Sequence, residues 1–154
     1  MNICDQYNHH NGLDKIQRKD GILEEIQYVL TNRNLSFGIN PPSEIKTSIN
    51  ERFNQKGWAD KVKVGNSNLT ISFIKSKVGI CFQIGNVART YADILKLTFL
   101  NNKGIIDVGV IIVPHKLEAK MMGGNYSQFE RLAKELLQFS DIVPAPILVI
   151  GLSN

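Results

Sequence analysis

The chain has 154 residues, 43% hydrophobic and 21% charged, and 18 basic against 14 acidic side chains give a net charge of +4. This length and composition predict a single domain, residues 1–154, with one hydrophobic core. No window approaches the ~20 apolar residues of a membrane span, and the N-terminus lacks the features of a signal peptide, so we expect a cytoplasmic protein without a membrane partner. Cys4 and Cys81 form no CxxC motif, which argues against disulfides and structural zinc sites.

The first third of the chain predicts two helices. Apolar residues recur at mostly helical spacing over residues 13–32, with Gly21 as a weak point. Ser43 is well placed as the N-cap of a second helix that runs to about Lys56 and is stopped by Gly57.

The rest of the chain predicts an α/β fold with a mixed sheet. Three short β-like runs, separated by Gly, Asn and Ser, are typical of an antiparallel meander. Two amphipathic helices then each precede a nearly all-apolar run, as expected of buried strands. In chain order, the expected elements are strands at 62–64, 69–75 and 78–84, a helix at 86–102, a strand at 105–113, a helix at 126–139 and a strand at 146–152.

Basic residues dominate the centre of the chain. From Lys61 to Lys103 there are seven Lys or Arg residues and one acidic residue, Asp93, which gives this stretch a net charge of +6. Phosphate-binding surfaces need such an excess, because each neutralised phosphate releases condensed counterions. A solvated basic face is the alternative interpretation. The chain has no GxxxxGK[ST] or GxGxxG loop, so the sequence gives nucleotide binding no support.

Several separated segments resemble the BglII and BstYI type II restriction endonucleases, most closely the BstYI branch. In chain order they are YNHHNGLDKIQ with LEEIQ, SINERF with KGW, SFIKSKVGICFQIGN, IIDVGVIIVP and VPAPILVIGL. The resemblance covers nearly the whole chain. It implies a restriction-endonuclease-like core of the PD-(D/E)xK superfamily, in which an antiparallel hairpin is followed by a crossover helix and a central strand.

The resemblance also implies an activity. Members of this family are symmetric homodimers that bind double-stranded DNA at a short palindrome, built around GATC in the BstYI branch, and hydrolyse one phosphodiester per strand with Mg²⁺. Two acidic residues hold the hard cation, which lowers the pKa of the attacking water. In the family pattern, approximately D-x8-E-x-Q, Ser72 takes the place of the Asp, Cys81 that of the Glu, and Gln83 that of the Gln.

Both acids of the pattern are therefore missing. Ser is a weak neutral ligand and Cys is soft, favouring zinc or copper(I), so the sequence predicts an impaired Mg²⁺ site and impaired cleavage. Glu51 in the second helix and Asp60 before the first meander strand are the candidates for a migrated carboxylate. Cys81 alternatively serves as a small buried hydrophobe, and Gln83 is either a relic or a hydrogen-bonding group near the DNA.

Four functional interpretations stay open. The first is a DNA-binding homodimer that has lost cleavage, and the second is an active nuclease with a rearranged metal site. In the third, Ser72 and Cys81 are engineered changes, and in the fourth the chain is a dimerisation or regulatory subunit that no longer binds DNA. The candidate DNA contacts are Lys63, Lys75, Lys77, Arg89 and Lys120. The candidate dimer surface is the helix at 86–102, which carries Tyr91, Leu97, Phe99 and Leu100 around much of its circumference.

Overall fold

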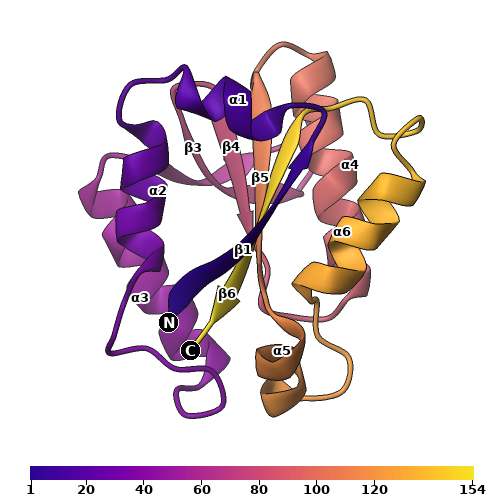
Figure 1. The fold of residues 1–154 in the computed structure, drawn as a ribbon. Helices are drawn as coiled ribbons and strands as arrows, with labels where there is room; N and C mark the ends of the chain where they lie inside the picture. Colours follow the sequence, from indigo (N-terminus) through magenta and orange to yellow (C-terminus); the bar gives the residue numbers. More distant parts are fainter.

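The computed structural model describes residues 1–154 and contains six strands and six helices (Figure 1). In chain order they are β1 (Asn2–His9), α1 (Gly12–Gln17), α2 (Ile22–Leu30), α3 (Pro42–Gln55), β2 (Ala59–Lys63), β3 (Thr70–Lys75), β4 (Val78–Phe82), α4 (Ala88–Asn102), β5 (Val108–Pro114), α5 (Lys116–Met122), α6 (Phe129–Gln138) and β6 (Ile147–Ser153). No helix combines the length and apolar composition that crossing a bilayer requires.

The strands form one mixed sheet in the order β1-β6-β5-β4-β3-β2. The three central strands β4, β5 and β6 run parallel, whereas β1, β2 and β3 pair antiparallel with their neighbours. The predicted mixed α/β fold and the predicted meander of β2, β3 and β4 are thus confirmed. Because β4 and β5 are parallel, α4 is the crossover that connects them.

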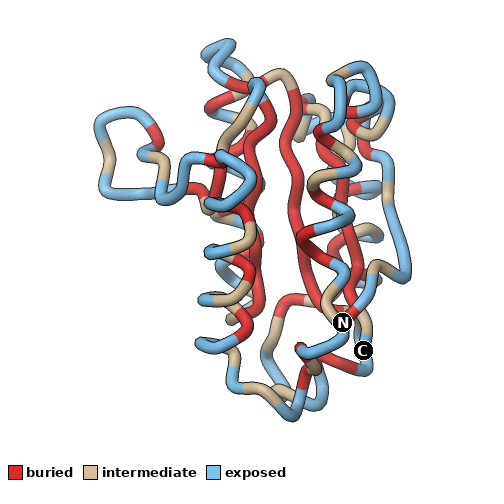
Figure 2. The backbone as a smooth tube through the Cα atoms, turned by 90° about the vertical axis from the view of Figure 1, so that its left-hand side faces the viewer, coloured by how far each residue is buried: buried red, intermediate tan, exposed pale blue.

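Helices cover both faces of this sheet. Side chains of α1, α2 and α3 pack with Phe73, Ile80 and Val110 on one face, and side chains of α4 and α6 pack with Cys81 and Ile111 on the other. Figure 1 shows α2 and α3 on one side of the strands and α4 and α6 on the other, and Figure 2 shows buried strands through the middle of the molecule. The alternation of side chains along each strand supplies both apolar faces.

The prediction that the chain begins with a helix is wrong, because β1 precedes α1. This strand lies at the edge of the sheet and pairs only with β6, from Asn2 opposite Ser153 to His9 opposite Ile147. Most of its side chains are polar and exposed. It therefore lacks the apolar run by which buried strands are recognised in a sequence.

The predicted helix over 13–32 is two helices, α1 and α2. The break lies between them, and Gly21, the N-cap of α2, has a φ of 71°, which a glycine adopts without strain. At the start of α1, a Cβ on Gly12 would lie 2.5 Å from the carbonyl carbon of Ile147. The absence of a side chain at Gly12 therefore lets α1 sit directly on β6.

The structure also corrects the cap of the next helix. Pro41, not Ser43, is the N-cap residue of α3, and Ser43 lies inside its first turn. Proline suits this first turn because it has no N–H to leave unpaired. The seven-residue helix α5 was not predicted. Its Leu117 and Met121 are exposed, so it has no continuous apolar face to mark it.

Candidate functional site

The start of β3 and the end of β4 lie side by side, at the carboxyl end of the parallel strands. The backbone ladder between them runs from Lys75 with Val78 to Phe73 with Ile80. Beyond that last pair, the Ser72 hydroxyl oxygen accepts a hydrogen bond from the backbone N–H of Phe82 at 2.9 Å. The Ser72 side chain thus continues the contact between the two strands where the ladder stops.

Cys81 points from β4 into the core beneath α4. It is 2% exposed and belongs to the same hydrophobic cluster as Ile94, Leu97 and Ile111. Burial, together with the negative charge of Asp93, raises the pKa of the Cys81 thiol well above its ordinary value, against an opposing effect of the Lys96 charge. The thiol is therefore held neutral, whereas nucleophiles and metal ligands need the thiolate.

Three polar side chains form a buried network between β4 and α4. The Gln83 amide donates to Oδ2 of Asp93 at 2.8 Å, and the Lys96 ammonium lies 2.5 Å from Oδ1 of Asp93. The same ammonium donates to the backbone carbonyl of Thr70 at 2.7 Å. Gln83 and Asp93 are 8% and 3% exposed, and the Lys96 side chain is 14% exposed. We call Gln83, Asp93 and Lys96 the polar network.

The two candidate migrated carboxylates lie away from the polar network. Glu51 is exposed on α3, which covers the opposite face of the sheet from α4. Asp60 is exposed on the edge strand β2, opposite Phe73. Neither residue forms an ion pair. The structure therefore does not bring either carboxylate together with Ser72, Cys81 or Gln83.

Three of the candidate DNA contacts lie at the carboxyl end of the parallel strands. Lys63 ends β2 opposite Thr70, Arg89 stands in the first turn of α4, and Lys120 lies on α5, directly after β5. All three side chains are exposed and form no ion pair. They share this end of the sheet with Gln83.

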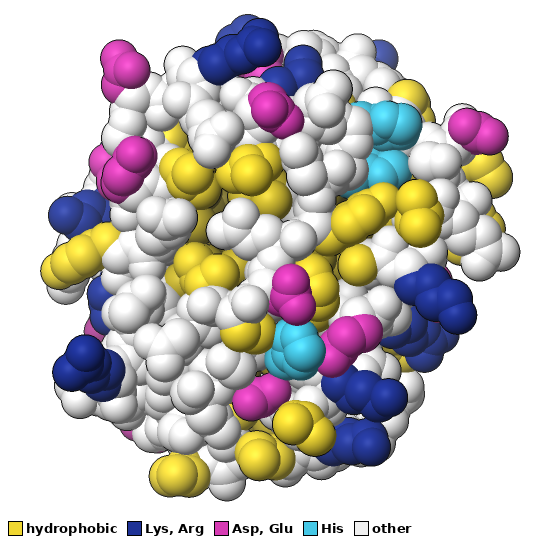
Figure 3. All heavy atoms as spheres, in the orientation of Figure 1, with side chains coloured by type: hydrophobic (Ala, Val, Ile, Leu, Met, Phe, Trp, Pro, Cys, Tyr) yellow, Lys and Arg dark blue, Asp and Glu magenta, His cyan; other side chains and the backbone are white.

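Lys75 and Lys77 lie at the other end of the strands. The Lys75 ammonium is 2.8 Å from the Glu25 carboxylate and 2.7 Å from the carbonyl oxygen of Lys56. Its charge is therefore already paired within the protein. Lys77, in the turn between β3 and β4, is 4.0 Å from Oδ1 of Asp107. The structure thus separates these two lysines from the other three candidates. On the face seen in Figure 3, Lys and Arg side chains lie around the margin rather than in the middle.

The candidate dimer surface on α4 needs a partial correction. Leu97 and Leu100 are buried against the sheet, at 0% and 1% exposure, and contribute nothing to an outer surface. Tyr91 and Phe99 are partly exposed, and Leu95, which the sequence prediction left out, is 71% exposed. The outward face of α4 is therefore apolar, but with a different set of residues.

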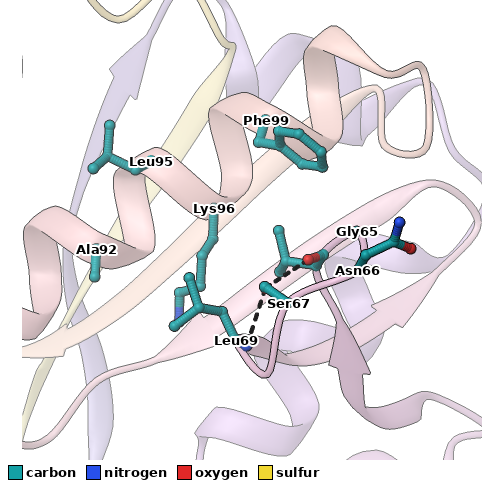
Figure 4. A pocket seen from close by; sticks show the side chains of 9 residues that line it. Gly65, Asn66, Ser67, Leu69, Ala92, Leu95, Lys96 and Phe99 are labelled. Carbon is teal, nitrogen blue, oxygen red and sulfur yellow. Dashed lines mark hydrogen bonds between the residues drawn. The ribbon is translucent and has the colours of Figure 1, made fainter.

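An open, mostly apolar groove of about 570 Å³ separates this part of α4 from the loop between β2 and β3. Leu95 and Phe99 line it from the helix, and Gly65 and Leu69 line it from the loop (Figure 4). Lys96 also lines the groove, and in Figure 4 its side chain extends from the helix toward Leu69. The groove therefore borders the polar network through Lys96.

The sequence of the whole chain decides the family. Residues 4–152 match the profile of the family described as restriction endonuclease BglII/BglIII. The chain belongs to this BglII family. Among curated proteins no match was found.

Solved structures of BglII share the fold of this BglII-family chain. The crystal structure of restriction endonuclease BglII complexed with a DNA 16-mer superimposes with a TM-score of 0.82 at 15% identity, over 100% of this chain and 77% of that one. The crystal structure of free BglII gives a TM-score of 0.73 at 16% identity, over 100% of this chain and 80% of that one. The predicted restriction-endonuclease-like core is thus confirmed.

Members of the BglII family generally use Mg²⁺, but the donors at this site do not fit that ion. Mg²⁺ needs near-octahedral oxygen ligands. The Ser72 oxygen accepts from the Phe82 N–H, the Cys81 thiol is soft and neutral, and both Asp93 oxygens are engaged by Gln83 and Lys96. Nowhere in the chain do three or more His, Cys, Asp or Glu residues gather in a group that could hold a metal ion.

Sequence reasoning noticed Asp93 only as the single acid of the basic stretch. The structure shows it in direct contact with Gln83, which the family pattern had singled out. One signal could have indicated its partner, because Asp93 and Lys96 are three residues apart and so lie on the same face of a helix. Nothing in the sequence indicates that this face turns toward Gln83.

Proposed function

We propose that this chain is a double-stranded DNA-binding member of the BglII family that has lost Mg²⁺-dependent cleavage and acts as one domain, residues 1–154. One observation carries the loss of cleavage. At the positions of the two family acids, Ser72 bonds to the backbone and Cys81 is a buried neutral thiol, while the nearby carboxylate of Asp93 is paired with Lys96. No second carboxylate stands within this group to hold a hard cation.

The proposed DNA contacts are the exposed cations at the carboxyl end of the parallel strands. Lys63, Arg89 and Lys120 lie there without acidic partners, which leaves their charges available to phosphates. A solved relative of the same fold, BglII, was crystallised with a DNA 16-mer. Phosphate contacts are chemically independent of metal ligands, so binding can outlast the loss of cleavage.

We further propose that the chain binds as a homodimer to a palindrome built around GATC, as in the BstYI branch. A two-fold symmetric dimer presents the same residues to each half of such a sequence. The exposed Tyr91, Leu95 and Phe99 on α4 offer an apolar surface for a second copy. Light scattering on the free protein tests this, and a monomer at high micromolar concentration would contradict it.

A paired assay of binding and cleavage tests the function. Labelled duplexes with and without GATC are incubated with the protein in Mg²⁺ or Mn²⁺, and samples are run on native and denaturing gels. We expect retarded DNA that prefers GATC, no cut strands, and affinity that falls steeply as salt rises. A variant carrying Ser72→Asp and Cys81→Glu runs beside it, and cutting by this variant alone would show that the natural residues abolish cleavage.

Two outcomes would overturn the proposal. Cleavage by the natural protein would make it an active nuclease, and Glu51→Ala and Asp60→Ala would then identify a migrated carboxylate. Binding no stronger than that of an unrelated basic protein of similar charge would leave a dimerisation or regulatory subunit.

A further inference from the structure

The Lys96 ammonium stands among the positions at which the family pattern places its acids and its Gln. It is 2.5 Å from Oδ1 of Asp93 and 2.7 Å from the carbonyl oxygen of Thr70, two residues before Ser72. Asp93 in turn accepts a hydrogen bond from Gln83, two residues after Cys81. A positive charge is therefore built into this site by the protein itself.

We propose that Lys96 is the resident cation of the site and takes the place of a divalent metal ion, so that the protein binds DNA without one. The proposal concerns metal binding by the free protein. Only its DNA arm rests on the proposed function.

Charge balance is the first argument. Two acids without a metal ion would leave a net negative site, which repels the phosphates of approaching DNA. Here the acids are replaced by Ser72 and Cys81, and the one remaining carboxylate, Asp93, is neutralised by Lys96. The site is balanced before any ion is added, so DNA approach needs no metal to screen it.

Geometry is the second argument. Lys96 lies one helical turn beyond Asp93 on α4, and its stem lines the apolar groove while its ammonium reaches inward to the carboxylate. The side chains of Lys96 and Asp93 are only 14% and 5% exposed, so water screens the pair weakly. A divalent ion that bound Asp93 would have to displace this ammonium and leave it without its carboxylate partner, with only the Thr70 carbonyl oxygen to accept from it.

The direct experiment measures Mn²⁺ binding to the DNA-free protein by calorimetry. We expect no saturable binding by the natural chain at millimolar Mn²⁺. The Lys96→Met variant exposes the Asp93 carboxylate and should bind Mn²⁺ saturably, with an affinity at least about tenfold above the upper limit set for the natural chain. Adding Asp93→Asn to this variant should abolish the gain. Lys134→Met, which removes an exposed lysine of α6 that forms no ion pair, is the control and should behave like the natural chain.

The DNA experiment compares affinity in EDTA with affinity in Ca²⁺ at constant ionic strength. The natural chain should bind equally in both, whereas Lys96→Met should weaken in EDTA and recover in Ca²⁺. The Lys96→Arg variant, which keeps the charge, should need no metal. If the natural chain does not bind DNA at all, the proposed function fails but the calorimetric result still decides this proposal.

The natural chain alone keeps the proposal testable if Lys96→Met does not fold, which thermal melting would show. Saturable Mn²⁺ binding by the natural chain that disappears in Asp93→Asn would overturn the proposal. Equal Mn²⁺ affinity of the natural chain and Lys96→Met would overturn it too.

Discussion

Asp93 carries the only negative charge between Lys61 and Lys103, and both of its carboxylate oxygens are bonded inside the protein. A buried carboxylate is tolerated only when it is paired and hydrogen-bonded, and here Lys96 and Gln83 meet both conditions. These two contacts leave neither carboxylate oxygen of Asp93 free. At the residue scale, the contacts that make this buried acid tolerable are also the ones that occupy its oxygens.

Breaking this pair should be costly. Asp93→Asn leaves the Lys96 ammonium buried without its partner, and we expect it to lower the free energy of unfolding by about 3–5 kcal/mol in urea denaturation. The double variant Asp93→Asn with Lys96→Met should recover much of that loss. As a control, Glu135→Gln removes the partner of the more exposed Arg131 and should cost far less. Equal losses in the two single variants would contradict the buried role of Asp93.

The two cysteines should differ in reactivity. Cys4 is exposed and Cys81 is buried, and burial raises the pKa of both thiols but that of Cys81 well above its ordinary value. At neutral pH, iodoacetamide should therefore alkylate Cys4 in the native protein and Cys81 only after unfolding. Mass spectrometry of peptides from native and urea-treated protein measures this. Rapid native labelling of Cys81 would show that the thiol is accessible.

At the element scale, the sequence predicted mainly the helices and strands whose apolar residues follow a regular spacing. The meander, the buried strands β5 and β6, and helices α4 and α6 carry that signal, whereas α3 was predicted from its expected ends at Ser43 and Gly57. Strand β1 does not, because edge position leaves its side chains polar, and α5 is too short to show a face. The contact of Gln83 with Asp93 depends on how α4 is rotated against the sheet, which local pattern does not encode.

The close packing of α1 on β6 should depend on Gly12. A Cβ at this position would lie 2.5 Å from the Ile147 carbonyl carbon and 2.8 Å from the Leu148 nitrogen, both of them backbone atoms. We expect Gly12→Ala to lower the free energy of unfolding by about 1–3 kcal/mol, because the helix must move away. Gly124→Ala, where a Cβ meets nothing within 4 Å, is the control and should cost much less in the same denaturation experiment.

Helix α2 is joined to the meander by a pH-sensitive contact. Although burial raises it, the pKa of Glu25 is lowered overall by hydrogen bonds from Lys75 and Trp58 and by the charge of Lys75. A carboxyl whose pKa is lower in the folded state stabilises the fold above its unfolded pKa, and this stabilisation disappears as the pH falls through the folded pKa. The melting temperature of Glu25→Gln should therefore lie below that of the natural chain at neutral pH. The difference should vanish in acid, and a difference independent of pH would contradict this assignment.

At the scale of the whole molecule, the basic side chains are divided between two ends of one sheet. Lys63, Arg89 and Lys120 stand at the end that also holds Gln83, whereas Lys75 and Lys77 stand at the other. A charge excess counted along the chain cannot show this division, because β3 and β4 carry the chain from one end to the other and back. Net charge therefore does not show where on the fold the basic side chains gather.

The division leads to a salt-dependence prediction. Replacing Lys63 or Lys120 by Gln should weaken DNA binding and reduce the slope of log affinity against log salt by about 0.9 per lost phosphate contact. Lys77→Gln removes the same charge at the other end and should leave the slope unchanged. Fluorescence anisotropy at several salt concentrations measures all three. If only Lys77→Gln reduced the slope of log affinity against log salt, the DNA would have to bind at the opposite end of the sheet.

The two edges of the sheet also constrain how copies of this chain can associate. Strand β1 bears mostly polar side chains, and β2 carries three charged residues and a positive φ of 48° at Lys61. The charged side chains and irregular backbone of β2 disfavour the addition of another strand at that edge. Pairing of β2 with a strand from another copy is therefore disfavoured.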